Sequence, residues 1–364
     1  MPALSIAPAL SVLAVLGRVP ASRPLRTWLR TTGYKLRPPR PLPYVTGGTR
    51  AVATAGVHEA TLLHEARSGD RPTIVLGGFV PDAPEQVFLL RGDLLRHGSV
   101  HYFNYPKSGF DLDRLCVQLD ELVQDLAARA GTPPVILAVS FGAGLAIEWL
   151  RRIRAAGRSA PIAGLVLISP VTCVADLIAP GSAKPTTLLG RAILPYLADE
   201  GEFRPEHIER SRSIFVRMFE AGAQNKSALA ALMTRAELLR LRDKVIATIN
   251  GIDRQGASAR IRALCQLPVP TEALAGDRLP LCEAPTLILY AEKENAVLQA
   301  AAPGRFLLTN AHRTLFPDSN VFTVSNSKGD PVQHASLIFH YFDFRAPIVS
   351  FYARLKGRKL LQVA

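Results

Sequence analysis

The chain has 364 residues, of which 48% are hydrophobic and 20% are charged. This length and apolar content allow one large domain with an insertion, or two ordinary domains, and exclude a disordered chain. Its 28 Pro and 26 Gly follow no repeat, which excludes the fibrous classes. The four cysteines are too widely spaced to predict a disulfide framework or a zinc site, so free and mostly buried thiols in a reducing compartment are expected. They are Cys116, Cys173, Cys265 and Cys282.

The net charge of +13 is concentrated near the two ends, between Arg18 and Arg40 and between Arg354 and Lys359. No basic groove with interleaved aromatic residues and no DNA-binding motif is found, so no nucleic-acid partner is expected. Residues 1–48 are predicted to form a basic arm rich in Pro and Arg. Its apolar first seventeen residues lack the basic start of a signal peptide and the length of a spanning helix. Peripheral contact with an anionic membrane and a disordered tail both remain open for this arm. The expected location is cytoplasmic, with or without membrane association.

The globular part is expected to begin near Arg50, where two apolar runs at 51–57 and 60–66 predict an opening pair of strands. Strand-like runs then alternate with helical patterns. This alternation predicts parallel strands joined by crossover helices and a sheet covered on both faces. The strands are expected at 73–76, 100–105, 134–139 and 162–169, and the helices at 83–96, 112–130 and 141–155.

The alternation stops between residues 171 and 283, where the patterns at 208–221, 227–241 and 243–249 are helical. Strand patterns resume at 286–290 and 321–324, and a last helix is predicted over 332–342. The simplest organisation is one α/β core interrupted by a helical insertion, because a second independent domain would leave the sheet split in sequence. The core would comprise 49–170 and 284–350, the insertion 171–283, and a basic C-terminal tail 351–364.

Ser140 lies between a predicted strand and a predicted helix, within Ala138-Val139-Ser140-Phe141-Gly142. A tight turn there would expose the hydroxyl, and the helix N-terminus would favour developing negative charge. The turn requires small residues two positions on either side of the serine. The segment resembles the Gly-x-Ser-x-Gly elbow of the α/β-hydrolase family, with Ala138 in place of the first Gly. This resemblance covers roughly residues 50 to 345 and implies an α/β-hydrolase fold, with 171–283 as the helical cap and Ser140 as the nucleophile.

A serine hydroxyl needs a histidine as its base. The family order of nucleophile, acid and histidine leaves four histidines after Ser140. His334 is favoured because it follows the last strand and the loop at 326–330, and because Gln333-His334-Ala335-Ser336-Leu337 is similar to the family pattern Gly-His-x-Ser-Leu. The other three are less suitable, His207 in the insertion, His312 in a polar loop and His340 within the last helix.

The acid that orients the histidine is less well defined by the sequence. The family usually places it in the loop after the strand that reads Pro285 to Tyr290 here, and Glu294 stands where the family normally has Asp. Glu is one carbon longer, so this loop is expected to lie slightly further back. Glu292, Asp176 and, more distantly, Asp318 remain alternatives.

The resemblance also implies an oxyanion hole made by backbone N–H groups. One would come from Phe141, directly after the nucleophile, and the other from Phe79, after Gly77-Gly78. The sequence contains no dinucleotide fingerprint, phosphate loop, paired-histidine zinc motif or calcium loop, so no cofactor or metal is expected.

The implied function is hydrolysis of a small-molecule carboxylic ester or thioester through an acyl-enzyme. Apolar residues of the insertion suggest a lipophilic acyl group, or else form the insertion's own core. Two alternatives stay open, an acyltransferase that uses the same acyl-enzyme and a non-catalytic binding protein with a degenerate triad. The apolar residues in question are Leu188, Leu189, Ile193, Leu194, Phe215, Met218 and Phe219.

Overall fold

The computed structural model describes most of the chain beyond the N-terminal arm. The described residues are 49–51, 58–130, 133–182, 184–197, 205–223, 232–270, 274, 276, 278–326 and 330–361. The arm expected at 1–48 lies outside them, together with residues 52–57 of the first expected strand. The membrane contact expected of the arm therefore stays a prediction.

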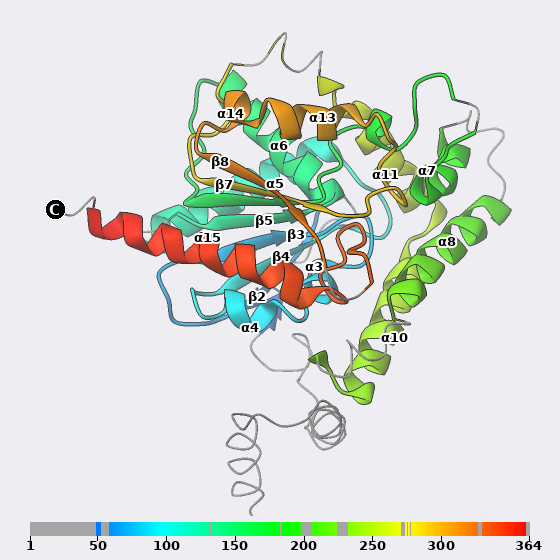
Figure 1. The fold of residues 1–364 in the computed structure, drawn as a ribbon, viewed down its shortest axis with the longest axis horizontal. Coiled ribbons are helices and arrows are strands. Elements are labelled where there is room, and N and C mark those ends of the chain that lie inside the picture. The colour runs from blue at the N-terminus through cyan, green and yellow to red at the C-terminus, as the bar shows by residue number, and fades with distance from the viewer. Residues whose placement is uncertain are drawn as a thin grey trace, which may run out of the picture.

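The described residues form one mostly parallel sheet of eight strands (Figure 1), in the order β1-β2-β4-β3-β5-β6-β7-β8. β2 pairs antiparallel with both β1 and β4, and every other pair is parallel. The predicted sheet class is confirmed. The strands are β1 (Thr49–Ala51), β2 (Thr61–Glu65), β3 (Thr73–Leu76), β4 (Val100–Asn104), β5 (Val135–Val139), β6 (Gly164–Ile168), β7 (Thr286–Ala291) and β8 (Ser319–Val324).

Helices cover both faces of the sheet, and the inner strands are buried on both sides. In β5, for example, Ile136 and Ala138 belong to one hydrophobic cluster while Leu137 and Val139 belong to the other, as a strand's alternation requires. One face is covered by α3 (Ala83–Gln86), α4 (Arg91–Leu94) and α15 (Tyr341–Leu361). The other is covered by α5 (Leu112–Ala130), α6 (Phe141–Ala155), α13 (Pro303–Asn310) and α14 (His312–Leu315).

The insertion after β6 is helical in its described residues and lies beside the sheet (Figure 1). Helix α10 (Arg235–Gly251) is continuous across residue 242, where the sequence patterns predicted the end of one helix and the start of another. Nothing in that stretch breaks a helix. α10 ends before Asp253, whose side chain accepts a 2.7 Å hydrogen bond from the Gly256 N–H and caps α11, a helix that the sequence patterns did not indicate. The elements are η1 (Val174–Asp176), α7 (Leu188–Ile193), η2 (Leu194–Tyr196), α8 (Pro205–Ala223), α10 (Arg235–Gly251) and α11 (Arg254–Gln266).

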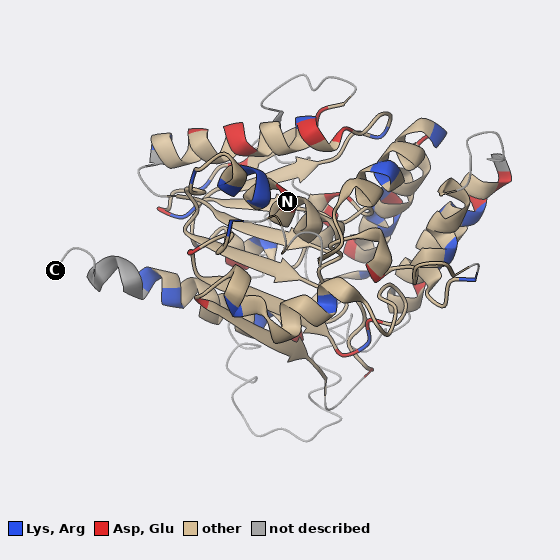
Figure 2. Cartoon of the chain, turned by 90° about the horizontal axis from the view of Figure 1, so that it is seen from above, with Lys and Arg blue, Asp and Glu red and all other residues tan. Residues whose placement is uncertain are grey.

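The C-terminal segment differs most from expectation. The last helix is not 332–342 but α15, which extends to Leu361 through most of the expected basic tail. Phe344, Phe351 and Leu355 are buried against the sheet, and basic residues alternate with these apolar positions along the helix (Figure 2). The charges at the end of the chain obscured this apolar stripe.

Two further findings concern membrane-spanning helices and thiols. No helix in the described ranges is long and apolar enough to cross a membrane. All four cysteines are free thiols, and Cys265 is the exposed one among them.

Candidate active site

Ser140 is held in a strained turn between β5 and α6. Its φ of 53° and ψ of −117° lie outside the regions that side chains favour. Its N–H donates to the carbonyl of Ile168 at 2.8 Å, and its carbonyl accepts from the N–H of Val171 at 3.1 Å. Hydrogen bonds to the end of β6 therefore fix the turn from both sides of the serine.

Glycines allow the backbone around Ser140 to pack closely. A Cβ on Gly142 would lie 2.5 Å from the carbonyl oxygen of Gly77, so no other residue fits without a shift. A Cβ on Gly78 would lie 3.2 Å from the Cβ of Ser140. The requirement for a small residue two positions after the serine thus arises from the contact between α6 and the segment that follows β3.

His334 lies in a turn before α15 rather than at the start of a helix. A parallel bridge joins Gln333 to Lys293, with the Lys293 N–H donating to the carbonyl of Val332 at 2.8 Å. This bridge sets the loop after β7 beside the loop after β8. The Nε2 of His334 lies 3.0 Å from the Oγ of Ser140, and its Nδ1 pairs with the Oε2 of Glu294.

Glu294 is 2% exposed and bonded through both carboxylate oxygens. Its Oε1 accepts from the hydroxyl of Ser169 at 2.8 Å and from the N–H of Ala291 at 2.6 Å. Burial alone would raise the pKa of Glu294, but His334 and these two donors hold it below its usual range. An ionised Glu294 accepts a hydrogen bond from the Nδ1–H of a neutral His334, which leaves Nε2 free to accept the hydroxyl proton of Ser140.

The alternative acids lie apart from this chain of contacts. Glu292 is exposed. Asp176 is buried, but its oxygens accept from the Thr172 N–H and hydroxyl and from the Gly304 N–H, and burial raises its pKa despite these bonds. Asp318 directly precedes β8 and so lies at the amino ends of the parallel strands, whereas Ser140, Glu294 and His334 follow their carboxyl ends.

The alternative histidines are also placed elsewhere. His207 is in α8 of the insertion. His312 begins α14 instead of lying in a loop, and its Nδ1 pairs with the hydroxyl of Ser319 at 2.6 Å. His340 precedes α15 instead of lying within the last helix, and its Nδ1 lies 3.4 Å from the carboxylate of Asp343.

Hydrogen bonds hold the segment after β3 beside Ser140. Gln86 accepts from the Gly78 N–H at 3.0 Å and donates to the carbonyl of Val80 at 3.3 Å. The rings of Phe79 and Phe141 stack with centroids 4.5 Å apart. Within the described residues, the N–H groups of Phe79 and Phe141 donate to no acceptor. Both therefore remain available to a substrate oxygen, as the donors of an oxyanion hole must be.

Arg260, from α11, ties the insertion to this segment. It is 3% exposed and donates to the carbonyl of Phe79 at 2.5 Å and to that of Pro106 at 2.9 Å. Burial lowers the pKa of Arg260 to about 10, although Asp82, Tyr105 and Asp253 act in the opposite direction and raise it.

Sequence reasoning missed three residues that support the site, Ser169, Gln86 and Arg260. Ser169 carried a usable signal, because it directly follows the strand next to the one that precedes Glu294. The other two carried none, since their hydrogen bonds go to backbone carbonyls and amides that only the folded chain brings near.

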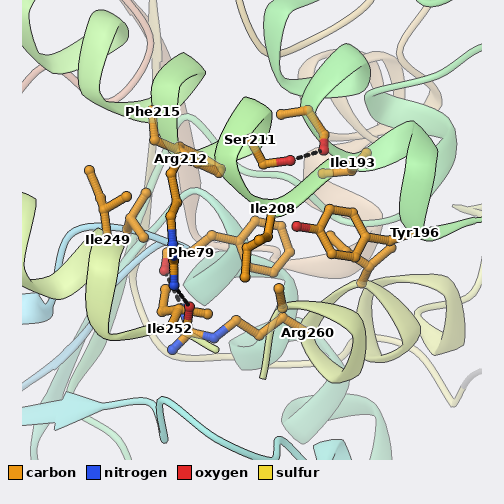
Figure 3. Close-up of a pocket in the computed structure, with 14 residues that line it drawn as sticks. Phe79, Ile193, Tyr196, Ile208, Ser211, Arg212, Phe215, Ile249, Ile252 and Arg260 are labelled. Atoms are coloured by element: carbon orange, nitrogen blue, oxygen red, sulfur yellow. Dashed lines mark hydrogen bonds between the residues drawn. The ribbon is translucent and has the colours of Figure 1, made fainter. Parts of the chain in front are cut away.

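An apolar pocket with about 490 Å³ of empty space, part of it open to solvent, lies between Phe79 and the insertion (Figure 3). Phe79 and Val80 form its side toward the core, and Ser140 is outside its lining. Of the apolar residues expected to form a substrate pocket, Ile193 and Phe215 line it, Leu188 is 39% exposed, and the rest pack into hydrophobic clusters. Lining residues that the sequence did not indicate include Ile208, Ile249, Ile252 and Ile261.

No cluster of three or more His, Cys, Asp or Glu side chains among the described residues is arranged to hold a metal ion.

Several solved structures share the fold of this chain. No curated protein matches it. An esterase from Thermogutta terrifontis superposes with a TM-score of 0.55 at 15% identity, over 84% of this chain and 97% of that one. An esterase from Rhodococcus sp. ECU1013 superposes with a TM-score of 0.53 at 15% identity, over 81% of this chain and 96% of that one. An epoxide hydrolase from Bacillus megaterium superposes with a TM-score of 0.54 at 11% identity, over 82% of this chain and 99% of that one.

These identities are low, so the superpositions concern the fold alone. The family itself follows from the sequence match, because the model of the Alpha/beta hydrolase family matches residues 76–326, from the end of β3 to just beyond β8. The chain therefore belongs to the alpha/beta hydrolase family, as its sequence predicted.

Proposed function

We propose that the chain is a serine hydrolase that cleaves a carboxylic ester or thioester with a lipophilic acyl group. The observation that carries this proposal is the continuous contact from the Ser140 hydroxyl through His334 to the buried carboxylate of Glu294. Esterases and epoxide hydrolases share the fold, so the fold alone leaves the reaction open. A serine with a base and an acid in line supports acyl transfer.

In the proposed first step, the Oγ of Ser140 attacks the carbonyl carbon while its proton moves to the Nε2 of His334. Glu294 stabilises the imidazolium through Nδ1. The carbonyl oxygen becomes an oxyanion, which the N–H groups of Phe79 and Phe141 bind. Collapse of the tetrahedral intermediate breaks the bond to the alcohol or thiol, which leaves with the proton from Nε2.

In the second step, a water molecule gives its proton to Nε2 and attacks the acyl carbon. The bond to Ser140 then breaks, the serine recovers its proton from His334, and the carboxylic acid is released. An acyltransferase would differ only in that an alcohol or amine takes the place of water. Product analysis with and without an alcohol acceptor distinguishes the two.

The lipophilic acyl group is proposed from the pocket. Two of its polar side chains bond to the protein: the Ser211 hydroxyl donates to the carbonyl of Ala192, and Arg212 donates to the carbonyl of Ile252, each within 2.8 Å. The surface left for a ligand is formed mainly by aliphatic and aromatic side chains (Figure 3). A hydrocarbon chain without a charged end fits this lining.

A fluorophosphonate probe on the purified full chain tests the nucleophile. Labelling should disappear in Ser140→Ala and fall strongly in His334→Ala, whereas Ser319→Ala, a buried serine at the other edge of the sheet, should label like the wild type. Folded wild-type protein that is never labelled would refute the enzyme and leave a binding role.

A series of p-nitrophenyl esters from acetate to laurate tests the pocket. Burial of each methylene contributes about 0.8 kcal/mol, so kcat/KM should rise about fourfold per methylene until the pocket is full. Ala257→Phe, which places a ring in the pocket, should shift the preference to shorter esters. Leu239→Phe, at an exposed position of α10, is the control. A preference that Ala257→Phe leaves unchanged would place the acyl chain elsewhere.

From the sequence alone, we also propose that the basic arm contacts anionic membranes. Deleting residues 1–40 should abolish co-sedimentation with phosphatidylserine vesicles; equal sedimentation of both forms would refute this.

A further inference from the structure

Ser169 is a buried hydroxyl residue beside the candidate triad. It follows β6 directly, is fully buried, and has a φ of 45° in the left-handed region. Its N–H donates to the carbonyl of Leu289 at 2.6 Å, which extends the pairing of β6 with β7 by one residue. The backbone therefore fixes where the Ser169 hydroxyl points.

This hydroxyl connects the acid to the loop that carries the base. It donates to the Oε1 of Glu294 at 2.8 Å and accepts from the N–H of Ala335 at 3.0 Å. Ala335 follows His334 directly and also has a positive φ, of 49°. One side chain thus holds the carboxylate and, through the backbone, the residue next to the imidazole.

The two oxygens of Glu294 have separate partners as a result. Oε2 faces the Nδ1 of His334, and Oε1 faces the Ser169 hydroxyl and the Ala291 N–H. With both donors present, rotation of the carboxylate away from His334 would leave buried polar groups unpaired, which is costly.

We propose that Ser169 is a positioning residue of the hydrolytic reaction, which orients Glu294 toward His334 and fixes the loop that follows His334. The inference rests on the proposed function. The Ser169 hydroxyl bonds to Glu294 and Ala335 and not to Ser140, and Ser169 does not line the apolar pocket, so its effect would pass through the acid and the base loop.

The pH dependence of the reaction gives a readout that a merely structural role would not affect. The titratable groups that face Glu294 among the described residues are His334 and Tyr290, and Tyr290 in turn faces Asp176 and Arg305. Loss of the Ser169 hydroxyl would remove a donor that favours ionised Glu294. It would also leave a more basic carboxylate to attract the imidazolium proton, and both effects move the acid limb of kcat/KM to higher pH.

The test compares Ser169→Ala and Ser169→Gly with wild type and Ser319→Ala. Both Ser169 variants lack the hydroxyl, and glycine accepts the positive φ without strain, so at least one of them should fold. Ser319 is also a buried serine, but it lies far from the triad at the start of β8. The measurements are the melting temperature, the rate of fluorophosphonate labelling, and the pH profile of kcat/KM for a short p-nitrophenyl ester.

We expect both Ser169 variants to label about 10-fold more slowly, as loss of one hydrogen bond to a charged group implies, and to shift the acid limb upward by about one pH unit. KM should change little, and Ser319→Ala should resemble the wild type in both readouts. Folded Ser169 variants with the wild-type rate and acid limb would overturn the inference, as would a lower melting temperature with an unmoved acid limb. Absence of labelling in the wild type would instead refute the proposed function, and this inference with it.

Discussion

Replacing Glu294 by Gln tests the proton arrangement on which the proposed chemistry depends. The Oε1 of Glu294 faces two donors, the Ser169 hydroxyl and the Ala291 N–H, so the single oxygen of Gln should occupy that place. The amide NH₂ then faces the Nδ1 of His334 and can only donate. The imidazole must accept at Nδ1 and carry its proton on Nε2, where it can no longer take the proton of Ser140.

The expected loss follows from this change of tautomer. Where an amide replaces the acid of a serine triad, kcat falls about 10,000-fold, which corresponds to about 5 kcal/mol of transition-state stabilisation. Glu294→Asp keeps the charge but withdraws the carboxylate by one C–C bond, about 1.5 Å. Contacts of 2.6 to 2.8 Å would then exceed hydrogen-bonding distance unless the loop moved. We expect an intermediate loss for Asp, about 10- to 100-fold.

The assay is the hydrolysis of a p-nitrophenyl ester at neutral pH, with the rate of fluorophosphonate labelling as a second readout. Glu292→Gln, in the same loop but exposed, should retain wild-type activity. Asp176→Asn tests the alternative acid and should lower the melting temperature, because three hydrogen bonds converge on its two oxygens. Glu294→Gln with activity within tenfold of the wild type would refute the assignment, and a larger loss in Asp176→Asn at full folding would move the role there.

Three further outcomes follow from the same contacts. Gly142→Ala should lower the free energy of unfolding by about 1–3 kcal/mol, because its Cβ would meet the carbonyl of Gly77, and an unchanged melting temperature would contradict that packing. Arg260→Met releases the carbonyl of Phe79 and should lower kcat while changing KM little. Values of kcat and KM equal to those of the wild type would argue against a fixed loop. Because the pKa of Glu294 is lowered in the folded protein, its ionisation stabilises the fold at pH values above the ordinary Glu pKa. This stabilisation is lost as the pH falls through the pKa of folded Glu294. Denaturant titrations at several pH values should show a smaller loss of stability in Glu294→Gln than in the wild type.

Much of the fold was readable from the sequence because it depends on local periodicity. The runs at 73–76, 112–130 and 141–155 coincide with β3, α5 and α6, since buried parallel strands are continuously apolar and amphipathic helices repeat with their own period. The C-terminal helix was misplaced because the apolar positions at Phe351 and Leu355 are interleaved with basic residues.

For the candidate site, the sequence by itself determined the residue types and their order: Ser140 at a strand-to-helix junction, a carboxylate after a later strand, and His334 after the last strand. The tertiary structure alone decided which carboxylate faces the histidine. Glu292 and Glu294 are two residues apart in one loop, but the bridge between Lys293 and Gln333 and the donors around Glu294 leave one exposed and the other buried. Such a choice depends on hydrogen bonds between segments distant in sequence, which no local pattern encodes.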